Sequence, residues 1–184
     1  MDRDLVLRAR AGDHAAFSEL AQRTIGRLTT VARAILRDEY LAQDAVQDAL
    51  VDAWRDLRGL REPDRFDAWI HRILVRACRL RARREWRRDR IEVVLGSDVD
   101  VPDRALLMTE GRDQIERALE RLSPEHRAVL VATYFLDLSL KESAAALDLP
   151  YDTMKSRLRR ASALLRAALE ADERLELVPQ EQFA

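Results

Sequence analysis

Apolar residues recur at three- and four-residue intervals along most of this chain, which is the pattern of helices that bury one face. The clearest case is a predicted long helix that begins at Tyr151, with an apolar stripe formed by Met154, Leu158, Ala161, Leu165 and Ala168. The opposite side of the same helix is polar. A long amphipathic helix is therefore predicted in the last quarter of the chain.

A shorter helix is predicted directly ahead of it. Ser139 and Glu142 have the Ser-x-x-Glu spacing of a capping box, so a helix is expected to begin there and to run through Leu147. The segment 148–150 (DLP) then predicts a tight turn. A short helix, a turn and a longer helix is the arrangement of a helix-turn-helix, whose second helix enters a DNA groove.

The polar side of the second helix carries residue types that contact DNA. Base edges are expected to meet Asp152, Lys155, Ser156 and Arg159 near the helix start, and phosphates to meet the flanking Arg157 and Arg160. A solvated helix face explains the same charges equally well, because basic amphipathic helices also serve partner proteins and membranes. The helix pattern alone leaves both interpretations open.

The rest of the chain is predicted to be helical as well. Before residue 90, four helices are expected: a short one from about residue 5, then 13–35, 39–57 and 64–88. Residues 91–102 lack helical periodicity, and acidic residues cluster within this segment and just beyond it. Helices are predicted again over 103–121 and 125–135. The expected fold is all-α, with two small helical domains (1–90 and 103–170), an acidic linker (91–102) and an acidic, fraying tail (171–184).

Composition agrees with an all-helical protein and excludes several classes of function. The 184 residues include only five glycines and five prolines. Cys78 stands alone, and His14, His71 and His126 lack ligand spacing, so neither a disulfide nor a metal site is expected. No glycine-rich phosphate loop or nucleophile motif is present, so we expect no cofactor and no enzyme activity. No segment approaches membrane-spanning length, and a cytoplasmic protein without membrane insertion is expected.

The net charge of -1 conceals a strong segregation of charge. Asp44, Asp48, Asp52 and Asp56 recur at four-residue spacing, which is locally repulsive and suits a basic partner surface, although a solvated helix face is the alternative. The next predicted helix reverses the sign, with arginines at 72, 76, 79, 81, 83, 84, 87, 88 and 90. That density indicates a polyanion. Interleaved aromatic residues such as Trp69 suit single-stranded nucleic acid, although Trp54 and Trp69 are also expected to pack in the core.

Together these segments closely resemble bacterial RNA polymerase sigma factors of the extracytoplasmic-function type, which keep only sigma regions two and four. The first half carries the resemblance in residues 15–20 (AAFSEL), 42–54 (AQDAVQDALVDAW) and 66–73 (FDAWIHRI). The second half carries it in residues 118–130 (ALERLSPEHRAVL), 134–139 (YFLDLS) and 153–161 (TMKSRLRRA). Four positions depart from the family pattern: Arg76, Leu80, Ser143 and Asp148 stand for a usual Asn, Asp, Ile and Gly.

The resemblance implies three partners: core RNA polymerase, promoter DNA and an anti-sigma factor. It implies core polymerase binding at Asp44, Gln47, Asp48 and Trp54. It implies upstream promoter contacts at Asp152, Thr153, Lys155, Ser156, Arg157, Arg159 and Arg160. Downstream recognition and melting would use the loop 57–65 and the arginine helix, through Arg61, Arg65, Trp69, Arg72, Arg76, Arg79, Arg83, Arg84 and Arg87. We expect this loop and helix to capture a flipped non-template base.

Two other hypotheses remain at this point. A helix-turn-helix regulator could bind promoters without being a polymerase subunit, with the first half sensing a signal or dimerising. A helical adaptor or anti-factor could bind proteins only, with its arginines as solvated charge. The acidic helix followed by the arginine helix favours the sigma-factor hypothesis over the regulator, because a sensor domain has no need of both a docking edge and a polyanion track.

Overall fold

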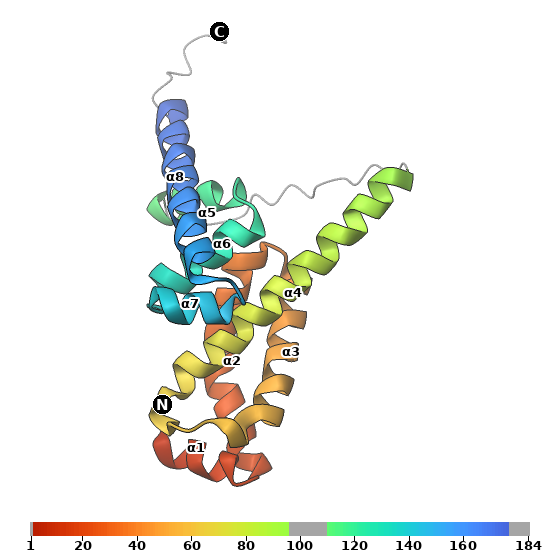
Figure 1. The fold of residues 1–184 in the computed structure, drawn as a ribbon, viewed down its shortest axis with the longest axis vertical. Coiled ribbons are helices and arrows are strands. Elements are labelled where there is room, and N and C mark those ends of the chain that lie inside the picture. The colour runs from red at the N-terminus through yellow and green to blue at the C-terminus, as the bar shows by residue number, and fades with distance from the viewer. Residues whose placement is uncertain (1, 96–109, 177–184) are drawn as a thin grey trace.

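The computed structural model describes residues 2–95 and 110–176, and within these ranges every regular element is a helix. Figure 1 shows the first three α-helices in the lower part of the view, the fourth running from the lower left to the upper right, and the last four at the upper left. The predicted all-α fold with two helical domains is confirmed.

The first domain consists of α1 (Arg3–Arg10), α2 (His14–Leu36), α3 (Glu39–Asp56) and α4 (Phe66–Leu95), with the short 3-10 turns η1 (Leu57–Gly59) and η2 (Pro63–Arg65) between α3 and α4. Aspartates start three of these helices: the carboxylates of Asp2, Asp13 and Asp38 accept backbone N–H groups of the first turns of α1, α2 and α3. Three of the four helix starts in this half therefore have a local side-chain cause.

Alanines let the helices of this domain approach closely. The buried face of α3 carries Ala42, Ala45, Ala49 and Ala53, and this helix packs between α2 and α4. Larger side chains fill the remaining space, and the fully buried ones include Leu20, Leu28, Phe66, Ile70 and Leu74. This packing holds the acidic edge of α3 and the arginines of α4 in one rigid unit.

The second domain consists of α5 (Glu110–Glu120), α6 (Pro124–Leu130), the π-helical turn η3 (Val131–Phe135), α7 (Leu140–Ala146) and α8 (Tyr151–Glu176). The predicted capping box is present, since the Ser139 hydroxyl accepts the backbone N–H of Glu142 and the Glu142 carboxylate accepts the backbone N–H of Ser139. Ser139 lowers the pKa of Glu142 through its hydroxyl and its backbone N–H, and Arg65 adds to this effect. Asp148 forms the turn with a left-handed φ of 48°, a conformation that aspartate tolerates.

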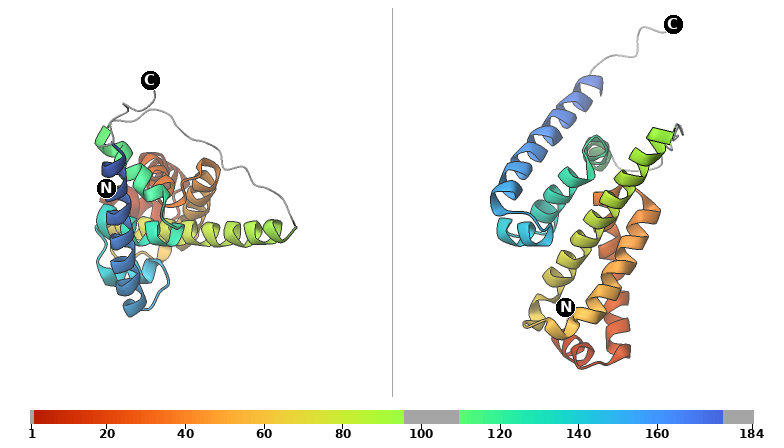
Figure 2. Two further views of the ribbon diagram at one scale, coloured as in Figure 1. Left: turned by 90° about the horizontal axis from the view of Figure 1, so that it is seen from above. Right: turned by 45° about the vertical axis from the view of Figure 1, so that its right-hand side comes forward.

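The two domains are packed against each other. Helices α6 and α7 contact α4, and α6 also contacts α2. Figure 2 shows the second domain lying along α2 and α4, while the end of α4 extends away from the rest of the molecule. Buried residues of both domains, among them Ile35, Leu74, Ala128 and Leu147, belong to one continuous apolar cluster.

Two predicted boundaries differ from the structure. Helix α4 continues to Leu95, inside the predicted linker 91–102, because the first helix-breaking residue is Gly96. Helix α8 continues to Glu176, inside the predicted fraying tail 171–184. There Asp172 is buried and forms an ion pair with Arg121, so the start of that segment packs on the domain. The remaining linker positions 96–102, the first part of the helix predicted over 103–121, that is residues 103–109, and the tail positions 177–184 lie outside the described residues.

Candidate nucleic-acid and protein interfaces

Helix α8 presents its polar start to solvent. Met154 and Ala161 are fully buried, and this orientation leaves one group of predicted base-reading side chains exposed: Asp152, Lys155, Ser156 and Arg159. Arg160 is exposed beside them. Thr153 is half-buried, and its backbone carbonyl accepts a hydrogen bond of 3.0 Å from the Ser156 hydroxyl. These side chains are therefore available to a groove of duplex DNA.

Arg157 lies differently from its neighbours. Its guanidinium forms an ion pair of 3.0 Å with Glu125 at the start of α6, and its side chain is 25% exposed. His126 lies next to this pair, and its pKa is lowered by burial and by the positive charges of Arg157 and Arg160. Arg157 is thus held against α6 of its own domain, whereas Asp152, Lys155, Ser156, Arg159 and Arg160 are exposed.

A pocket lies under the loop that joins α3 to α4. It has a volume of about 290 Å³ and is lined by Gly59, Leu60, Arg61, Glu62, Arg65, Trp69 and Arg72. Arg10 of α1 braces this loop by donating a hydrogen bond of 3.1 Å to the Leu60 carbonyl. The Trp69 ring packs on Phe66 with ring centroids 5.9 Å apart. Four of the predicted downstream contact residues, Arg61, Arg65, Trp69 and Arg72, are therefore brought together around one concave site.

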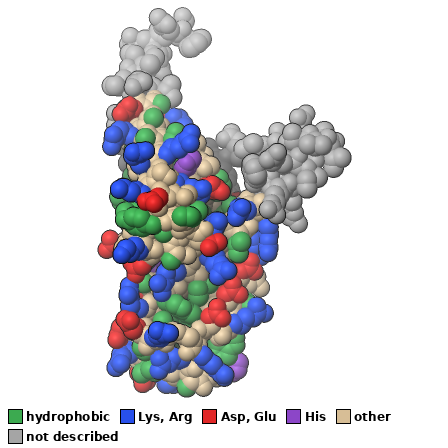
Figure 3. All heavy atoms as spheres, in the orientation of Figure 1, with side chains coloured by type: hydrophobic (Ala, Val, Ile, Leu, Met, Phe, Trp, Pro, Cys, Tyr) green, Lys and Arg blue, Asp and Glu red, His purple; other side chains and the backbone are tan. Residues whose placement is uncertain are grey.

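The remaining arginines of α4 have different environments. Arg76, Arg83 and Arg84 are exposed, as a polyanion track requires. Arg79 is 15% exposed and forms an ion pair of 3.5 Å with Asp148 in the turn of the helix-turn-helix. The side chain of Arg87 lies outside the described residues. Figure 3 shows Lys and Arg side chains spread along the whole face shown in that view, with acidic side chains between them.

The acidic edge of α3 is partly neutralised within its own domain. Arg81 of α4 forms ion pairs of 2.7 Å with Asp44 and 2.6 Å with Asp48. Both carboxylates stay accessible, with 53% and 45% of their side chains exposed, and Gln47 between them is also exposed. The sequence pattern placed Arg81 among the polyanion-binding arginines. Its pairing across two helices could not be read from spacing along one helix.

Trp54, the fourth predicted polymerase contact, packs within the domain. Its ring lies 4.4 Å from the His14 ring and 5.0 Å from the Phe17 ring, measured between centroids. It therefore joins α3 to the start of α2. Trp54 is half-buried and packs behind the accessible edge formed by Asp44 and Asp48. A smaller fraction of its surface is exposed than of those two side chains.

Sequence reasoning missed Arg127, which lies buried between the domains. Its guanidinium donates hydrogen bonds to backbone carbonyls at the end of α2 and in the turn that follows α5. Burial lowers its pKa to about 10, so it remains charged at neutral pH. Ser143, the departure from the family pattern in α7, is also buried, and its hydroxyl bonds to the Leu138 carbonyl over 3.4 Å.

Other classes of site find no support in the part of the chain that the structure describes. No three His, Cys, Asp or Glu side chains of the described residues gather where they could hold a metal ion. None of the described helices combines the length and the apolar character that crossing a bilayer demands. Cys78 is buried, and burial raises the pKa of its thiol to about 12, so it is not a reactive nucleophile.

Comparison with known proteins identifies both domains. Residues 20–88 match the family model described as sigma-70 region 2, and residues 112–165 match sigma-70, region 4. The ECF RNA polymerase sigma factor SigM of Mycobacterium tuberculosis is 35% identical over 164 residues, which cover 89% of this chain and 82% of SigM. The pocket loop lies within the first matched region and the helix-turn-helix within the second.

Solved structures show the same fold. The structure of CnrH, a sigma factor of Cupriavidus metallidurans, in complex with the cytosolic domain of CnrY has a TM-score of 0.58, 30% identity and coverage of 93% of this chain and 98% of that one. The sigma factor RpoE of Bartonella quintana, in complex with the anti-sigma factor NepR, has a TM-score of 0.65, 24% identity and coverage of 85% and 98%. A regulator that acts without polymerase leaves the region 2 match unexplained. The chain belongs to the sigma-70 family as an RNA polymerase sigma factor of the ECF type, which directs promoter-specific initiation of transcription.

Proposed function

We propose that the two domains divide promoter recognition, with α8 reading the upstream, minus-thirty-five duplex and the first domain reading and opening the downstream element. The observation that carries this proposal is the pocket between the loop and α4. Its lining combines the aromatic residue Trp69 with three arginines, Arg61, Arg65 and Arg72. Few functions other than holding an unstacked base and its phosphates need this combination.

The chemistry of the pocket suits a flipped base. Opened DNA exposes the faces of its bases, and stacking one of them on an aromatic ring contributes roughly 1–3 kcal/mol. Arginines around the ring attract the flanking phosphates, and Glu62 adds a carboxylate acceptor at the same site. Exposed Arg76, Arg83 and Arg84 extend the basic surface along α4, so the opened strand has a continuous path away from the pocket.

At the upstream element, the exposed residues Lys155, Ser156 and Arg159 suit direct contact with base edges, because they lie in the first turns of the second helix of a helix-turn-helix. Arg160 suits a phosphate contact beside them. Asp152 and Thr153 lie at the start of the same helix and complete the proposed upstream contact set.

The docking surface for core polymerase is proposed on α3. Asp44, Gln47 and Asp48 form an accessible polar edge, and polar edges of this kind set orientation and encounter rate more than affinity. Trp54 supports this edge from the inner side of the helix. Core polymerase then carries the chemistry of RNA synthesis, and this chain acts as a non-catalytic, cytoplasmic initiation factor.

An anti-sigma factor is proposed as a further partner. The similar RpoE of Bartonella quintana is found in complex with the anti-sigma factor NepR. A protein whose docking edge and DNA-binding surfaces are both exposed offers such a partner several surfaces to cover. The chemistry of that partner would have to match a face with interspersed acidic and basic side chains.

Reconstituted transcription tests the proposed division of labour. Purified bacterial core polymerase, a promoter library and this chain should yield transcripts with defined starts, and omission of the chain should abolish them. Aligning the active promoters should reveal two separate conserved elements. Complex formation should weaken steeply with added salt because arginines displace counterions from phosphates. A single conserved element, or a flat salt response, would contradict the proposal.

A further inference from the structure

The contact between the two domains uses arginines that the proposed function assigns to promoter DNA. Arg65, on the wall of the pocket, forms an ion pair with Glu142 of α7. Arg79, on α4, forms an ion pair of 3.5 Å with Asp148 in the turn before α8. Both carboxylates belong to the helix-turn-helix. Each one therefore occupies a guanidinium that the proposed function gives to a phosphate.

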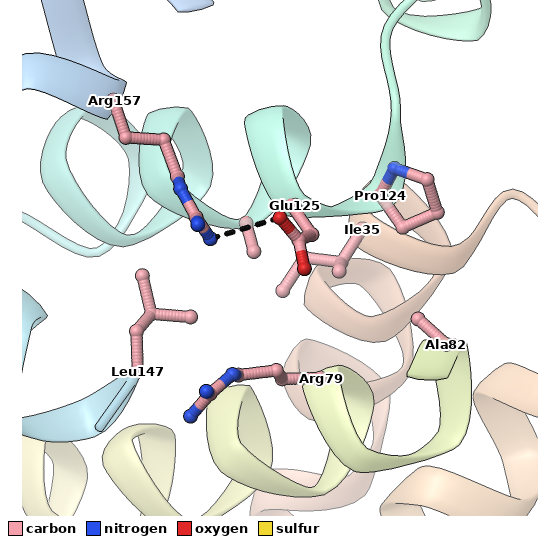
Figure 4. Close-up of a pocket in the computed structure, with 8 residues that line it drawn as sticks. Ile35, Arg79, Ala82, Pro124, Glu125, Leu147 and Arg157 are labelled. Atoms are coloured by element: carbon pink, nitrogen blue, oxygen red, sulfur yellow. Dashed lines mark ion pairs between the residues drawn. The ribbon is translucent and has the colours of Figure 1, made fainter. Parts of the chain in front are cut away.

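Arg157, one of the proposed upstream contact residues on α8, lies beside the contact between the domains. Figure 4 shows Arg157 of α8 and Arg79 of α4 on opposite sides of a small pocket, with Glu125 of α6 paired to Arg157. The apolar part of this pocket is formed by Ile35, Ala82, Ala128 and Leu147, which come from both domains. This interface between the domains, which we call the joint, thus occupies Arg65 and Arg79 of the proposed downstream surface and lies beside Arg157 of the upstream surface, which is paired within its own domain.

Exposed ion pairs alone are too weak to hold two domains together. Buried contacts provide the further stabilisation that holds the two domains together. Arg127 donates hydrogen bonds across the joint to the carbonyls of Ile35 and Leu36, at 2.6 and 3.3 Å. Arg37, just beyond them, pairs with Glu116 and Glu120 of α5. This combination of apolar burial, a buried guanidinium and flanking ion pairs favours one defined closed arrangement.

We propose that the free protein is self-inhibited: in the closed arrangement Glu142 and Asp148 act as internal substitutes for DNA phosphates on Arg65 and Arg79. This inference rests on the proposed function of those arginines. Carboxylates and phosphates accept guanidinium hydrogen bonds in the same way, so the two ligands compete for the same donors. Two promoter elements at separate places on a duplex also require the domains to move apart, which breaks the joint. Binding of core polymerase and promoter would then replace contacts that the chain makes with itself.

The chain allows a test that removes charge with little change of shape. Glu142→Gln keeps an acceptor for the capping box, because Gln serves at that position as Glu does. Asp148→Asn keeps a residue that adopts the left-handed backbone of the turn. The matched control is Asp137→Asn with Glu19→Gln. Asp137 has a left-handed φ of 51° in the same domain, and Glu19 pairs with Arg23 in the first half of α2, whereas Arg127 bonds to the end of that helix at Ile35 and Leu36.

The full chain, without polymerase, is compared with both double variants by two measurements: affinity for a fluorescein-labelled oligothymidine strand, and the radius of gyration by small-angle X-ray scattering. We expect the Glu142→Gln, Asp148→Asn variant to bind the strand about fivefold more tightly, as follows from the loss of two exposed ion pairs. The radius shows whether the joint, which keeps the Arg127 hydrogen bonds and its apolar contacts, stays closed or opens in that variant. The control variant should match the wild type in both. Circular dichroism melting confirms that each variant is folded, and the two single variants provide a second set if the double variant is not.

Equal affinity in the wild type and the folded test variant would overturn self-inhibition, whatever the radius. So would an equal gain of affinity in the control variant, because the effect would then come from net charge alone. Reconstituted transcription with core polymerase is run on the same preparations. If the wild type directs no promoter-specific transcripts, the proposed division of promoter recognition fails, whereas the oligothymidine and scattering results still decide whether the closed joint masks Arg65 and Arg79.

Discussion

The buried guanidinium of Arg127 donates from Nε to the backbone carbonyl of Ile35 over 2.6 Å, although the two residues are 92 positions apart in the chain. The carbonyls at the end of a helix have no partner within the helix, and the negative end of the helix dipole favours a positive charge. Arg127 meets both requirements for α2. It also donates to the Leu122 carbonyl over 2.7 Å, and so joins the turn that follows α5 to the same point.

Arg127→Met should destabilise the protein by about 3 kcal/mol, because it removes charge-assisted hydrogen bonds and leaves buried carbonyls without donors. Urea denaturation followed by circular dichroism measures the loss. Arg166→Met, at an exposed position of α8, is the matched control and should change the free energy of unfolding little. Equal losses in the two variants would show that the buried hydrogen bonds of Arg127 contribute nothing beyond an exposed arginine.

Lys155→Ala and Arg159→Ala should each weaken binding to the upstream promoter element by about 1–3 kcal/mol, because each removes an exposed donor from the reading face of α8. Electrophoretic mobility shift of the polymerase complex on promoter DNA provides the measurement. Arg166→Ala carries the same loss of charge further along the helix. If that variant loses as much affinity as the other two, general charge rather than position would account for the binding.

Trp69→Leu should weaken binding to opened downstream DNA about tenfold, since leucine keeps apolar packing on Phe66 but removes the flat ring on which a base stacks. The quenching of 2-aminopurine in the non-template strand reports stacking directly. Trp54→Leu alters an aromatic ring packed on His14 and Phe17 instead, and should leave the quenching unchanged. Similar losses of quenching in both variants would exclude a specific role for the pocket.

Asp44→Asn with Asp48→Asn should slow association with core polymerase on the order of tenfold at low salt, since the change leaves Arg81 unpaired and reverses the local charge of the edge. Stopped-flow fluorescence measures the rate. The control is Asp52→Asn with Asp56→Asn, which removes the same charge from the same helix. A slowing that persists at high salt, or that is equal in the control, would argue against electrostatic docking through this edge.

The free energy of unfolding should decrease as the pH falls from 7.5 to 5.5. The folded protein lowers the pKa of His71, mainly by burial and then by the charge of Arg27, and it lowers the pKa of His126 by burial and by Arg157 and Arg160, both from an ordinary value of 6.5. As the pH falls below 6.5, the unfolded chain therefore binds protons at His71 and His126 more readily than the folded chain does. The stability that these neutral histidines contribute above pH 6.5 is lost as the pH falls toward their lowered pKa values in the folded protein.

Urea denaturation at the two pH values checks this dependence. The His71→Gln, His126→Gln variant should have a flatter pH profile in the same window, because neither glutamine titrates. An unchanged slope in this variant would assign the pH dependence to other groups.

Much of the fold was predictable because its causes are local. The capping box of Ser139 and Glu142, the turn at Asp148 and the buried stripe through Met154 depend on residues a few positions apart, and each appears where the spacing predicts it. The exposed reading face of α8 follows from that stripe, since burying one side of a helix exposes the other. The ends of α4 and α8 were placed too early, because charge and aperiodicity indicated breaks where no Gly or Pro stands.

The features of the candidate sites likewise have either local or non-local causes. Periodicity alone predicts which side of α3 is acidic and which helix carries arginines. Helix packing decides that Arg81 neutralises Asp44 and Asp48, that Arg65 and Arg79 are held by Glu142 and Asp148, and that Arg127 is buried at all. A helix repeats its side-chain directions every few residues, so one-dimensional spacing reports its faces. The partner of a charged side chain depends on which other helix lies opposite, and that choice is made by burial of apolar surface across the whole molecule.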